Sequence, residues 1–305
     1  MAQSQVMTRE STATLEAIPE AKRVVEVRQA PRGHWVGDGF PVRTIFAYDN
    51  AAATSPFLLM DYAGPYHFQP AYKRRGVGEH PHRGFETVTI LYSGEVEHRD
   101  SAGGGGKIGP GDVQWMTAGS GVVHEEMHSE AYTRSGGPFE AIQLSVNLPA
   151  RLKMTAPKYQ TLLATQIPDV ALPDNAGRVR VIAGQFGTAK GPAETYTPMN
   201  LWDVRLSAGH GGSFVAQAGH TGAVFVLKGT INVNGAKARE SELINLDRKG
   251  EVFTIEAETD AVLLILSGEP IDEPVFGYGP FVMNTENEIR RAMADYQSGK
   301  MGHLA

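Results

Sequence analysis

The sequence contains no cysteine, no excess of basic residues and no long hydrophobic run. Without cysteine the chain forms no disulfide and no thiolate metal site, so histidine and carboxylate side chains must carry any metal chemistry. The 28 lysines and arginines against 34 aspartates and glutamates give a net charge of −6. Because this offers no basic field for phosphates, we expect no direct binding of nucleic acid. No apolar stretch approaches the roughly 18 residues of a membrane span, so we expect no membrane insertion.

The first 22 residues are polar and lack the apolar core of a secretory signal. We interpret them as a flexible N-terminal tail. A chain with neither a signal nor a span stays in the compartment where it is made, so we predict a cytoplasmic protein.

Glycine and proline, in contrast, are plentiful. The 35 glycines and 18 prolines are spread between short β-rich runs, such as residues 87–92 and 223–229, rather than pooled in one linker. This pattern predicts an all-β fold. A short helix is expected near the C-terminus at residues 284–297, where Thr285 and Glu288 form a capping box and apolar residues recur at helical spacing.

Two stretches of the chain resemble each other. "TILYSGEVEH" at 89–98 and "VFVLKGTINV" at 224–233 each combine an apolar strand, a glycine (Gly94 or Gly229) and an alternating strand. A proline-rich segment with little alternation separates the two units and is interpreted as a connector on the surface. We therefore predict four parts: a tail at 1–22, an N-terminal metal-binding unit at 23–147, a connector at 148–177 and a metal-free unit with the terminal helix at 178–305.

Histidines and glutamates two residues apart occur in two places. His80 and His82 lie in "EHPHRGFE", and His124 and Glu126 lie in "VVHEEMH". Residues two apart on a strand point to the same side, so two neighbouring strands would bring three imidazoles and one carboxylate to a single ion. Such a nitrogen-rich set without sulfur suits Fe(II), Mn(II), Co(II), Ni(II), Cu(II) or Zn(II).

Glu86 is a second carboxylate near the first pair. It shares the parity of His80 and His82 if the strand is continuous, although Gly84 is a place where a strand bends or bulges. Spacing alone therefore leaves open whether Glu86 or Glu126 is the carboxylate ligand.

Three segments resemble the pirin family: residues 80–126, 147–159 and 277–296. The resemblance implies a bicupin, with two antiparallel β-barrels and one iron, Fe(II), bound in the N-terminal barrel by three histidines and one glutamate. Carried onto this sequence, it gives as ligands His80, His82, His124 and Glu126. Cupins in general place a carboxylate ligand where Glu86 stands, so we keep Glu86 as a reserve ligand or a neighbour of the ligands.

The resemblance also implies an activity. Several pirins are flavonol (quercetin) 2,3-dioxygenases, and four protein ligands on a six-coordinate ion leave two positions open. We predict a small aromatic, flavonol-like substrate and O2, with Glu126 as both ligand and general base. Other pirins are described as metal-dependent regulators, so the alternative is a non-catalytic redox sensor that binds a protein partner. A cupin sugar isomerase is a third interpretation, which the pirin-like segments disfavour.

Several further residues have two interpretations each. Phe57, Phe85, Trp115 and Met116 are expected either to line an aromatic pocket or to fill the barrel core. The pair His98 and Asp100 either orients a ligand or forms a plain surface turn.

The chain departs from the common pirin pattern at residues 56–65, where "PFLLMDYAGP" replaces a stretch resembling "PFLFLDHFGP". Tyr62 and Ala63 thus replace a histidine and a phenylalanine of that pattern. A different substrate is expected if this segment covers the pocket. In the second unit, the offsets of His80 and His82 from Gly94 lead to Val215 and Gln217, which predicts a barrel without metal.

Overall fold

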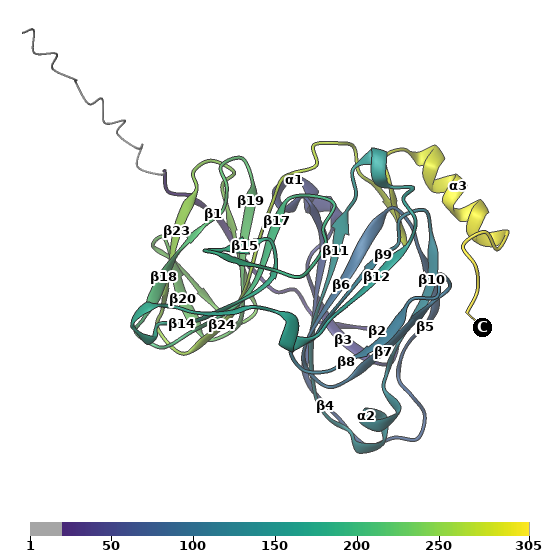
Figure 1. Ribbon diagram of the computed structural model, residues 1–305, viewed down its shortest axis with the longest axis horizontal. Coiled ribbons are helices and arrows are strands. Elements are labelled where there is room, and N and C mark those ends of the chain that lie inside the picture. The colour runs from purple at the N-terminus through teal and green to yellow at the C-terminus, as the bar shows by residue number, and fades with distance from the viewer. Residues whose placement is uncertain (1–19, 305) are drawn as a thin grey trace, which may run out of the picture.

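The computed structural model describes residues 20–304. It is an all-β bicupin with antiparallel sheets and a short C-terminal helix, as predicted. Figure 1 shows the two barrels side by side, with helix α3 (Glu286–Gln297) on the outer side of the N-terminal barrel. None of the described helices is long and apolar enough to cross a membrane. The predicted tail falls almost entirely outside the described residues.

The N-terminal barrel consists of a seven-stranded and a four-stranded sheet. In spatial order the larger sheet holds β12 (Lys158–Leu162), β9 (Val113–Thr117), β6 (Phe85–Ser93), β11 (Gly137–Asn147), β4 (Phe57–Phe68), β3 (Phe40–Phe46) and β2 (His34–Val36). The smaller sheet holds β5 (Gly76–His82), β10 (Val122–His128), β7 (Val96–Asp100) and β8 (Gly105–Ile108). Helices α1 (Ala51–Thr54) and α2 (Glu130–Ser135) and the 3-10 turn η1 (Tyr48–Asn50) join its strands.

The C-terminal barrel repeats this plan, again with seven strands facing four. The larger sheet holds β1 (Val24–Gln29), β22 (Glu242–Leu246), β19 (Thr221–Lys228), β24 (Ala261–Gly268), β17 (Met199–Leu206), β14 (Gly177–Ala183) and β13 (Asp169–Ala171). The smaller sheet holds β18 (Gly211–Val215), β23 (Val252–Ala257), β20 (Thr230–Val233) and β21 (Ala236–Arg239). Two short hairpins complete the strands, β15 (Gln185–Phe186) with β16 (Ala189–Lys190), and β25 (Phe276–Tyr278) with β26 (Phe281–Met283).

Both ends of the described chain cross to the other barrel. Strand β1 pairs with β22 of the C-terminal barrel, and the buried Lys22 ammonium donates to three backbone carbonyls there. Helix α3, which the sequence-based division placed in the C-terminal unit, packs instead on the N-terminal barrel together with β26. Its predicted capping box is present, since Thr285 accepts from the Glu288 amide and donates to the Glu288 carboxylate. The two units therefore exchange their terminal segments.

The predicted connector is also more structured than its composition indicated. It carries β12 in the larger sheet of the N-terminal barrel and β13 in that of the C-terminal barrel. Three 3-10 turns separate these strands from their neighbours: η2 (Ala150–Leu152), η3 (Ala164–Gln166) and η4 (Pro173–Asn175).

A large apolar core lies between the barrels, formed by the outer faces of the two seven-stranded sheets. Val88, Leu144 and Met60 face it from the N-terminal barrel, and Phe225 and Leu264 face it from the other. On β4, β6 and β11 of the N-terminal barrel, the residues next to these point into that barrel instead, since side chains alternate along a strand. These strands are therefore apolar on one side and free to carry polar groups on the other.

A candidate metal centre in the N-terminal barrel

The histidines singled out in the sequence come together where β5 pairs with β10. His124 lies directly opposite His80 in the antiparallel ladder, and His82 lies two pairs further along, opposite Val122. The ring of His124 is 4.2 Å from that of His80 and 4.8 Å from that of His82, measured between centroids. One nitrogen from each of the three rings lies within 4.8 Å of the others. The predicted two-strand arrangement thus brings the three imidazoles to one point.

Hydrogen bonds orient two of these rings. His80 donates from Nδ1 to the Gly78 carbonyl at 2.8 Å, and His82 donates from Nδ1 to the Pro280 carbonyl at 3.3 Å. A carbonyl only accepts, so both rings carry their proton on Nδ1 and keep the lone pair of Nε2. Nε2 of His124 is buried and has no hydrogen-bond partner.

Two of the imidazoles, His82 and His124, are also held in the neutral form that metal binding requires. Burial and the neighbouring His80 ring lower the pKa of His82 to about 3. Burial and the rings of His82 and His80 hold the pKa of His124 well below its usual value. Three converging rings, with a buried and unpartnered nitrogen among them, fit a divalent cation.

Glu126 lies on the same strand as His124, past a bulge, with its side chain 3% exposed. Its carboxylate accepts hydrogen bonds from three neutral donors: Oε1 from Thr89 at 3.3 Å and from the Gln114 amide, and Oε2 from the Gln143 amide at 3.2 Å. A carboxylate oxygen of Glu126 also lies within 4.8 Å of ring nitrogens of His124 and His98. The carboxylate is therefore next to the imidazole cluster and fixed from behind.

Glu86 points away from this cluster. Strand β5 ends at His82 and β6 begins at Phe85, so the strand is not continuous and parity does not carry across. Gly84 makes the break with φ +88°, and a side chain there would meet the Val282 carbonyl oxygen at 2.0 Å. The expectation of Glu86 as a reserve ligand thus conflicts with this geometry: its carboxylate accepts from Thr117 at 2.7 Å, and burial raises its pKa to about 7.

The turn after His82 is tied down by distant parts of the chain. The Arg83 guanidinium pairs with Asp295 of α3 at 2.9 Å, and its backbone pairs with Phe281. The Lys153 ammonium, 1% exposed, donates to the carbonyls of Gly84 and Val282 and to the Asn147 side chain. Burial lowers the pKa of Lys153 to about 8. The C-terminal segment therefore fixes the end of the strand that carries two of the imidazoles.

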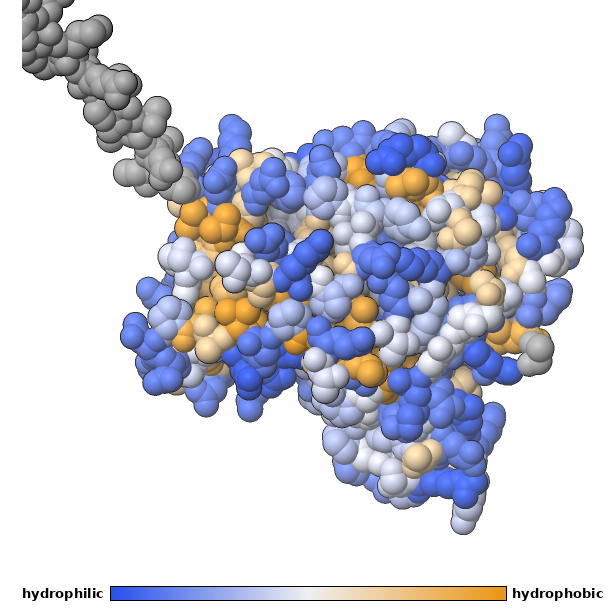
Figure 2. Space-filling view, viewed as in Figure 1, coloured by the Kyte–Doolittle hydropathy of each residue, from blue (hydrophilic) through white to orange (hydrophobic). Residues whose placement is uncertain are grey.

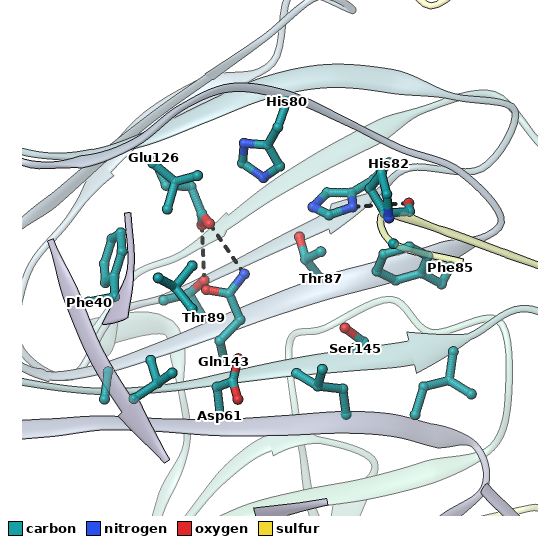
Figure 3. A pocket seen from close by; sticks show the side chains of 18 of the residues that line it. Phe40, Asp61, His80, His82, Phe85, Thr87, Thr89, Glu126, Gln143 and Ser145 are labelled. Carbon is teal, nitrogen blue, oxygen red and sulfur yellow. Dashed lines mark hydrogen bonds between the residues drawn. The ribbon is translucent and has the colours of Figure 1, made fainter. Parts of the chain in front are cut away.

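A cavity of about 320 Å³ opens beside the cluster, and Figure 3 shows His80, His82 and Glu126 projecting into it. Most of its lining is apolar, as in typical ligand pockets. Of the four aromatic candidates from the sequence, Phe85 lines the cavity. Phe57 and Trp115 belong to the core between the barrels, and Met116 to a small cluster with Ala118 and Val122. Phe40 and Tyr48 also line the cavity and were not expected from the sequence.

One wall of the cavity carries a row of polar side chains that crosses the larger sheet. Neighbouring strands pair Thr44 with Asp61, Asp61 with Gln143, Gln143 with Thr89 and Thr89 with Gln114. Asp61 accepts a hydrogen bond from Thr44 at 2.6 Å, yet burial raises its pKa. The sequence shows this row only as isolated polar residues within apolar strands. It places hydrogen-bonding groups along the cavity, ending at Glu126.

His98 and Asp100 are buried beside the cluster rather than in a surface turn. The side chain of His98 is fully buried and that of Asp100 is 3% exposed. His98 Nδ1 lies 3.2 Å from His124 Nδ1, and its Nε2 lies 3.2 Å from Asp100 Oδ2. Burial would raise the pKa of Asp100, but hydrogen bonds from His98 and from the backbone amides of Gly104 and Ala102 outweigh it and lower the pKa.

Strand β4 carries the segment that departs from the pirin pattern. Ala63 lines the cavity, and Tyr62 points to the opposite side, towards the other barrel. The Tyr62 hydroxyl donates to Glu140 at 2.5 Å, and its ring packs against Phe225 at 5.2 Å. Of the exchanges at Tyr62 and Ala63, therefore, the one at Ala63 changes the cavity; Leu59, which replaces a phenylalanine of the pattern, also lines it.

In the C-terminal barrel the described residues form no comparable cluster. Register places Phe214, not Val215, where His80 stands, because Phe214 pairs with Phe253 of β23 as His80 pairs with His124 of β10. The expected correspondence is thus shifted by one residue, and Val215 points outward with 55% exposure. His210 lies on the surface and donates to the Ala208 carbonyl.

Comparison with known proteins assigns both halves of the chain. The Pirin family profile matches residues 39–146, and the profile of the pirin C-terminal cupin domain matches residues 201–302. A Pseudomonas aeruginosa protein provisionally named quercetin 2,3-dioxygenase is 55% identical over 92% of this chain and 98% of its own. A Caulobacter vibrioides pirin-like protein is 38% identical over 88% of this chain and 96% of its own.

A solved structure leads to the same assignment. The crystal structure of quercetin 2,3-dioxygenase from Acinetobacter baumannii superposes with a TM-score of 0.91 at 50% identity, covering 93% of this chain and all of the other. The fold, both profiles and these relatives agree, and the chain belongs to the pirin family.

Proposed function

We propose that this protein is a metal-dependent dioxygenase that opens a flavonol, or a similar planar enol, with O2. The observation that carries the proposal is one arrangement: three converging imidazoles and a hydrogen-bonded carboxylate beside a largely apolar cavity of about 320 Å³. The names of the Pseudomonas and Acinetobacter relatives support the same substrate class.

The ligands that we propose are His80, His82 and His124, each through Nε2, and Glu126 through its carboxylate. The buried, unpartnered Nε2 of His124 supports this set. Fe(II) is the ion that the family resemblance favours, and the nitrogen-rich donor set suits Mn(II), Co(II), Ni(II), Cu(II) and Zn(II) as well. When bound, the ion would supply Lewis-acid and redox chemistry.

In this proposal Glu126 is the catalytic residue that accepts the proton of the substrate hydroxyl. Its carboxylate faces the cavity, while Thr89, Gln114 and Gln143 hold it from behind. Three donors leave lone pairs on the two oxygens, so one oxygen can still take a proton. The reaction consumes one O2, opens the heterocycle and releases one ring carbon as carbon monoxide, with both oxygen atoms of O2 entering the products.

The cavity walls would position the substrate. Phe85 and Phe40 offer aromatic faces to a planar ring system. Asp61 of β4, which pairs with Gln143 of β11, would accept a hydrogen bond from a phenolic hydroxyl of the substrate. Both interactions fit a polyhydroxylated aromatic molecule better than a sugar.

A regulatory role through a protein partner has no comparable support in the structure. Figure 2 shows a face on which hydrophilic residues predominate and apolar residues reach the surface in small, separate patches. The cytoplasmic location stays a prediction from the sequence.

The decisive experiment measures oxygen uptake with quercetin and related flavonols, after the metal-free protein has been loaded anaerobically with each of the six metals. We expect uptake together with carbon monoxide for at least one metal. In Glu126→Gln we expect metal to be retained and uptake to fall by roughly 10²- to 10⁴-fold.

Glu125→Gln is the matched control, because Glu125 is the next residue on β10 and its carboxylate accepts from Arg99 at 2.6 Å, away from the cavity. Uptake in this variant should stay at the wild-type level. If no oxygen is taken up with any metal and any flavonol of the panel, the proposed reaction is refuted. Metal lost in Glu86→Ala but kept in Glu126→Ala would show that the carboxylate ligand has been assigned wrongly.

A further inference from the structure

The third imidazole of the cluster differs from the other two in its hydrogen-bond partner. His80 and His82 each donate to a carbonyl, which cannot donate in return. His124 instead faces the Nδ1 atom of another imidazole, His98, at 3.2 Å. Since a neutral imidazole donates from one nitrogen and accepts at the other, this contact alone allows either ring to be the donor. Whether Nε2 of His124 has a lone pair for a metal therefore depends on which nitrogen of His98 carries the proton.

Asp100 holds His98 from its other side, and it determines the direction of the chain of hydrogen bonds. Asp100 Oδ2 lies 3.2 Å from His98 Nε2, and Oδ1 accepts the backbone amides of Ala102 at 2.8 Å and Gly104 at 2.9 Å. An ionised carboxylate only accepts, so His98 must donate from Nε2. His98 Nδ1 is then an acceptor, and His124 must donate to it from Nδ1.

We propose that Asp100 and His98 form a hydrogen-bond relay whose role is to fix the tautomer of His124, with the proton on Nδ1 and the lone pair of Nε2 facing His80 and His82. In this proposal both are positioning residues, since His98 contacts His124 at Nδ1, on the side away from the lone pair of Nε2, and Asp100 contacts His98. The inference rests on the metal site of the proposed function but not on the reaction proposed there.

The surroundings keep the relay in place. Tyr159 of β12 stacks on the His98 ring, with centroids 4.6 Å apart and planes 10° from parallel. The Tyr159 hydroxyl donates to the Gln114 side chain at 3.3 Å, and the Gln114 amide in turn donates to Glu126. Water does not reach the His98 side chain, which is fully buried. One wall thus orients both the His124 ring and the Glu126 carboxylate.

The C-terminal barrel offers an internal control. Val96 pairs with His128 and His98 with Glu126 in the first barrel, as Ile231 pairs with Ala257 and Val233 with Ile255 in the second. Val233 therefore stands where His98 does, and Gly235, two residues on, stands where Asp100 does. The barrel that lacks the ligands also lacks the relay, as expected if the relay serves the metal site.

The test reads the tautomer of His124 in the metal-free protein by ¹⁵N NMR of the histidine rings, and the affinity for Co(II) by titration. In the wild type we expect the His124 proton on Nδ1. In Asp100→Asn the amide oxygen keeps the two backbone donors, so the amide nitrogen donates to His98 and the relay reverses. The proton of His124 should then move to Nε2, and Co(II) affinity should fall by roughly 10- to 100-fold.

A second pair of variants keeps the test valid if Asp100→Asn does not fold. His98→Asn retains an acceptor near Nδ1 of His124 and should keep Co(II) affinity within a few-fold of wild type. His98→Leu removes the acceptor and should lose about as much affinity as Asp100→Asn. Asp112→Asn is the matched control, because Asp112 also accepts two backbone amides but contacts no histidine of the cluster.

A wild-type His124 protonated on Nε2, or Asp100→Asn and His98→Leu with wild-type Co(II) affinity, would overturn the relay. If the tautomers and affinities come out as expected while no flavonol is consumed, the relay stands and the reaction of the proposed function fails.

Discussion

The two barrels share one strand plan but differ in what fills them. In the N-terminal barrel β10 carries His124, which joins the imidazole cluster, and Glu126, which lines the cavity. In the C-terminal barrel β23 has Phe253 and Ile255 at the matching positions, and Phe253 stacks on Phe214 with ring centroids 5.7 Å apart. The second interior is therefore a closed apolar core, whereas the first is polar at the matching place and open.

Since the two barrels share one strand plan, the fold alone does not determine the site. A handful of inward-facing positions decide whether this β framework encloses a polar cluster beside a cavity or a packed core. Polar residues at these positions are buried and need hydrogen-bond partners. The N-terminal barrel supplies them through the polar row behind Glu126. The second barrel has no such need, because apolar side chains satisfy one another by contact.

The largest expected effect tests whether metal binding belongs to one barrel alone. In His80→Ala one of three converging imidazoles is lost, so metal affinity should fall by more than the roughly 10- to 100-fold caused by losing an outer hydrogen-bond partner. Metal content by elemental analysis after dialysis measures this. His210→Ala is the control, since His210 lies on the C-terminal barrel and should leave the metal content unchanged. Equal loss of metal in both variants would show that metal binding is not confined to the N-terminal barrel.

The second prediction tests the packed interior. Phe253→Ala removes a ring that is 1% exposed from the core of the C-terminal barrel. We expect the free energy of unfolding to fall by about 3–5 kcal/mol, from lost burial and the cavity left behind. Urea unfolding measures the change. Metal content under native conditions should stay at the wild-type level, and a parallel loss of metal would show that the second barrel takes part in binding.

The third prediction concerns Glu86, which stands where the C-terminal barrel has Thr221, a residue satisfied by two carbonyls. Burial raises the pKa of Glu86 from 4.5 to about 7, so between these values the native protein keeps a proton that the unfolded chain has lost. The free energy of unfolding should therefore fall as the pH rises through this window, by up to about 3 kcal/mol, and level off above it.

Glu86→Gln cannot ionise and can still accept from Thr117. We expect it to match the wild type near pH 4.5 and to be the more stable protein at pH 8, as measured by unfolding at a series of pH values. A difference between the two proteins that does not change with pH would contradict the raised pKa.

The smallest expected effect comes from a variant that makes the interior of the N-terminal barrel more like that of the C-terminal barrel. Ala63→Phe places a ring in the cavity beside the substrate position. If flavonols turn over, KM should rise about 10-fold, equivalent to about 1.4 kcal/mol, with metal content unchanged. Steady-state oxygen uptake measures KM, and thermal unfolding checks that the ring has not damaged the fold. An unchanged KM would mean that the substrate does not reach this wall.

Local patterns in the sequence were sufficient for the fold and for the positions that meet in the cluster. Pairs two residues apart on strands predicted which side chains share a face, and the repeat around Gly94 and Gly229 predicted two barrels. Both signals depend on neighbours in the chain. The pairing of β1 with the second barrel and of α3 with the first depends on contacts about 200 residues apart, which no local pattern encodes.

The errors have the same origin. The orientation of Glu86 followed from one backbone conformation, at Gly84, which ends a strand that the spacing had allowed to continue. The correspondence of Val215 failed by one residue because the turn between strands differs in length between the barrels. His98 and Asp100 looked like a turn because their burial depends on β10 and β12, which lie elsewhere in the sequence.

The contact between His82 and the Pro280 carbonyl also has a consequence for biosynthesis. The three histidines of the proposed metal site have been translated by residue 124, yet the acceptor that orients His82 is translated about 200 residues after His82. Until the chain has been synthesised past Pro280, the nascent N-terminal barrel presents at most two oriented imidazoles. The order of translation therefore delays completion of the proposed metal site until the second barrel has been made.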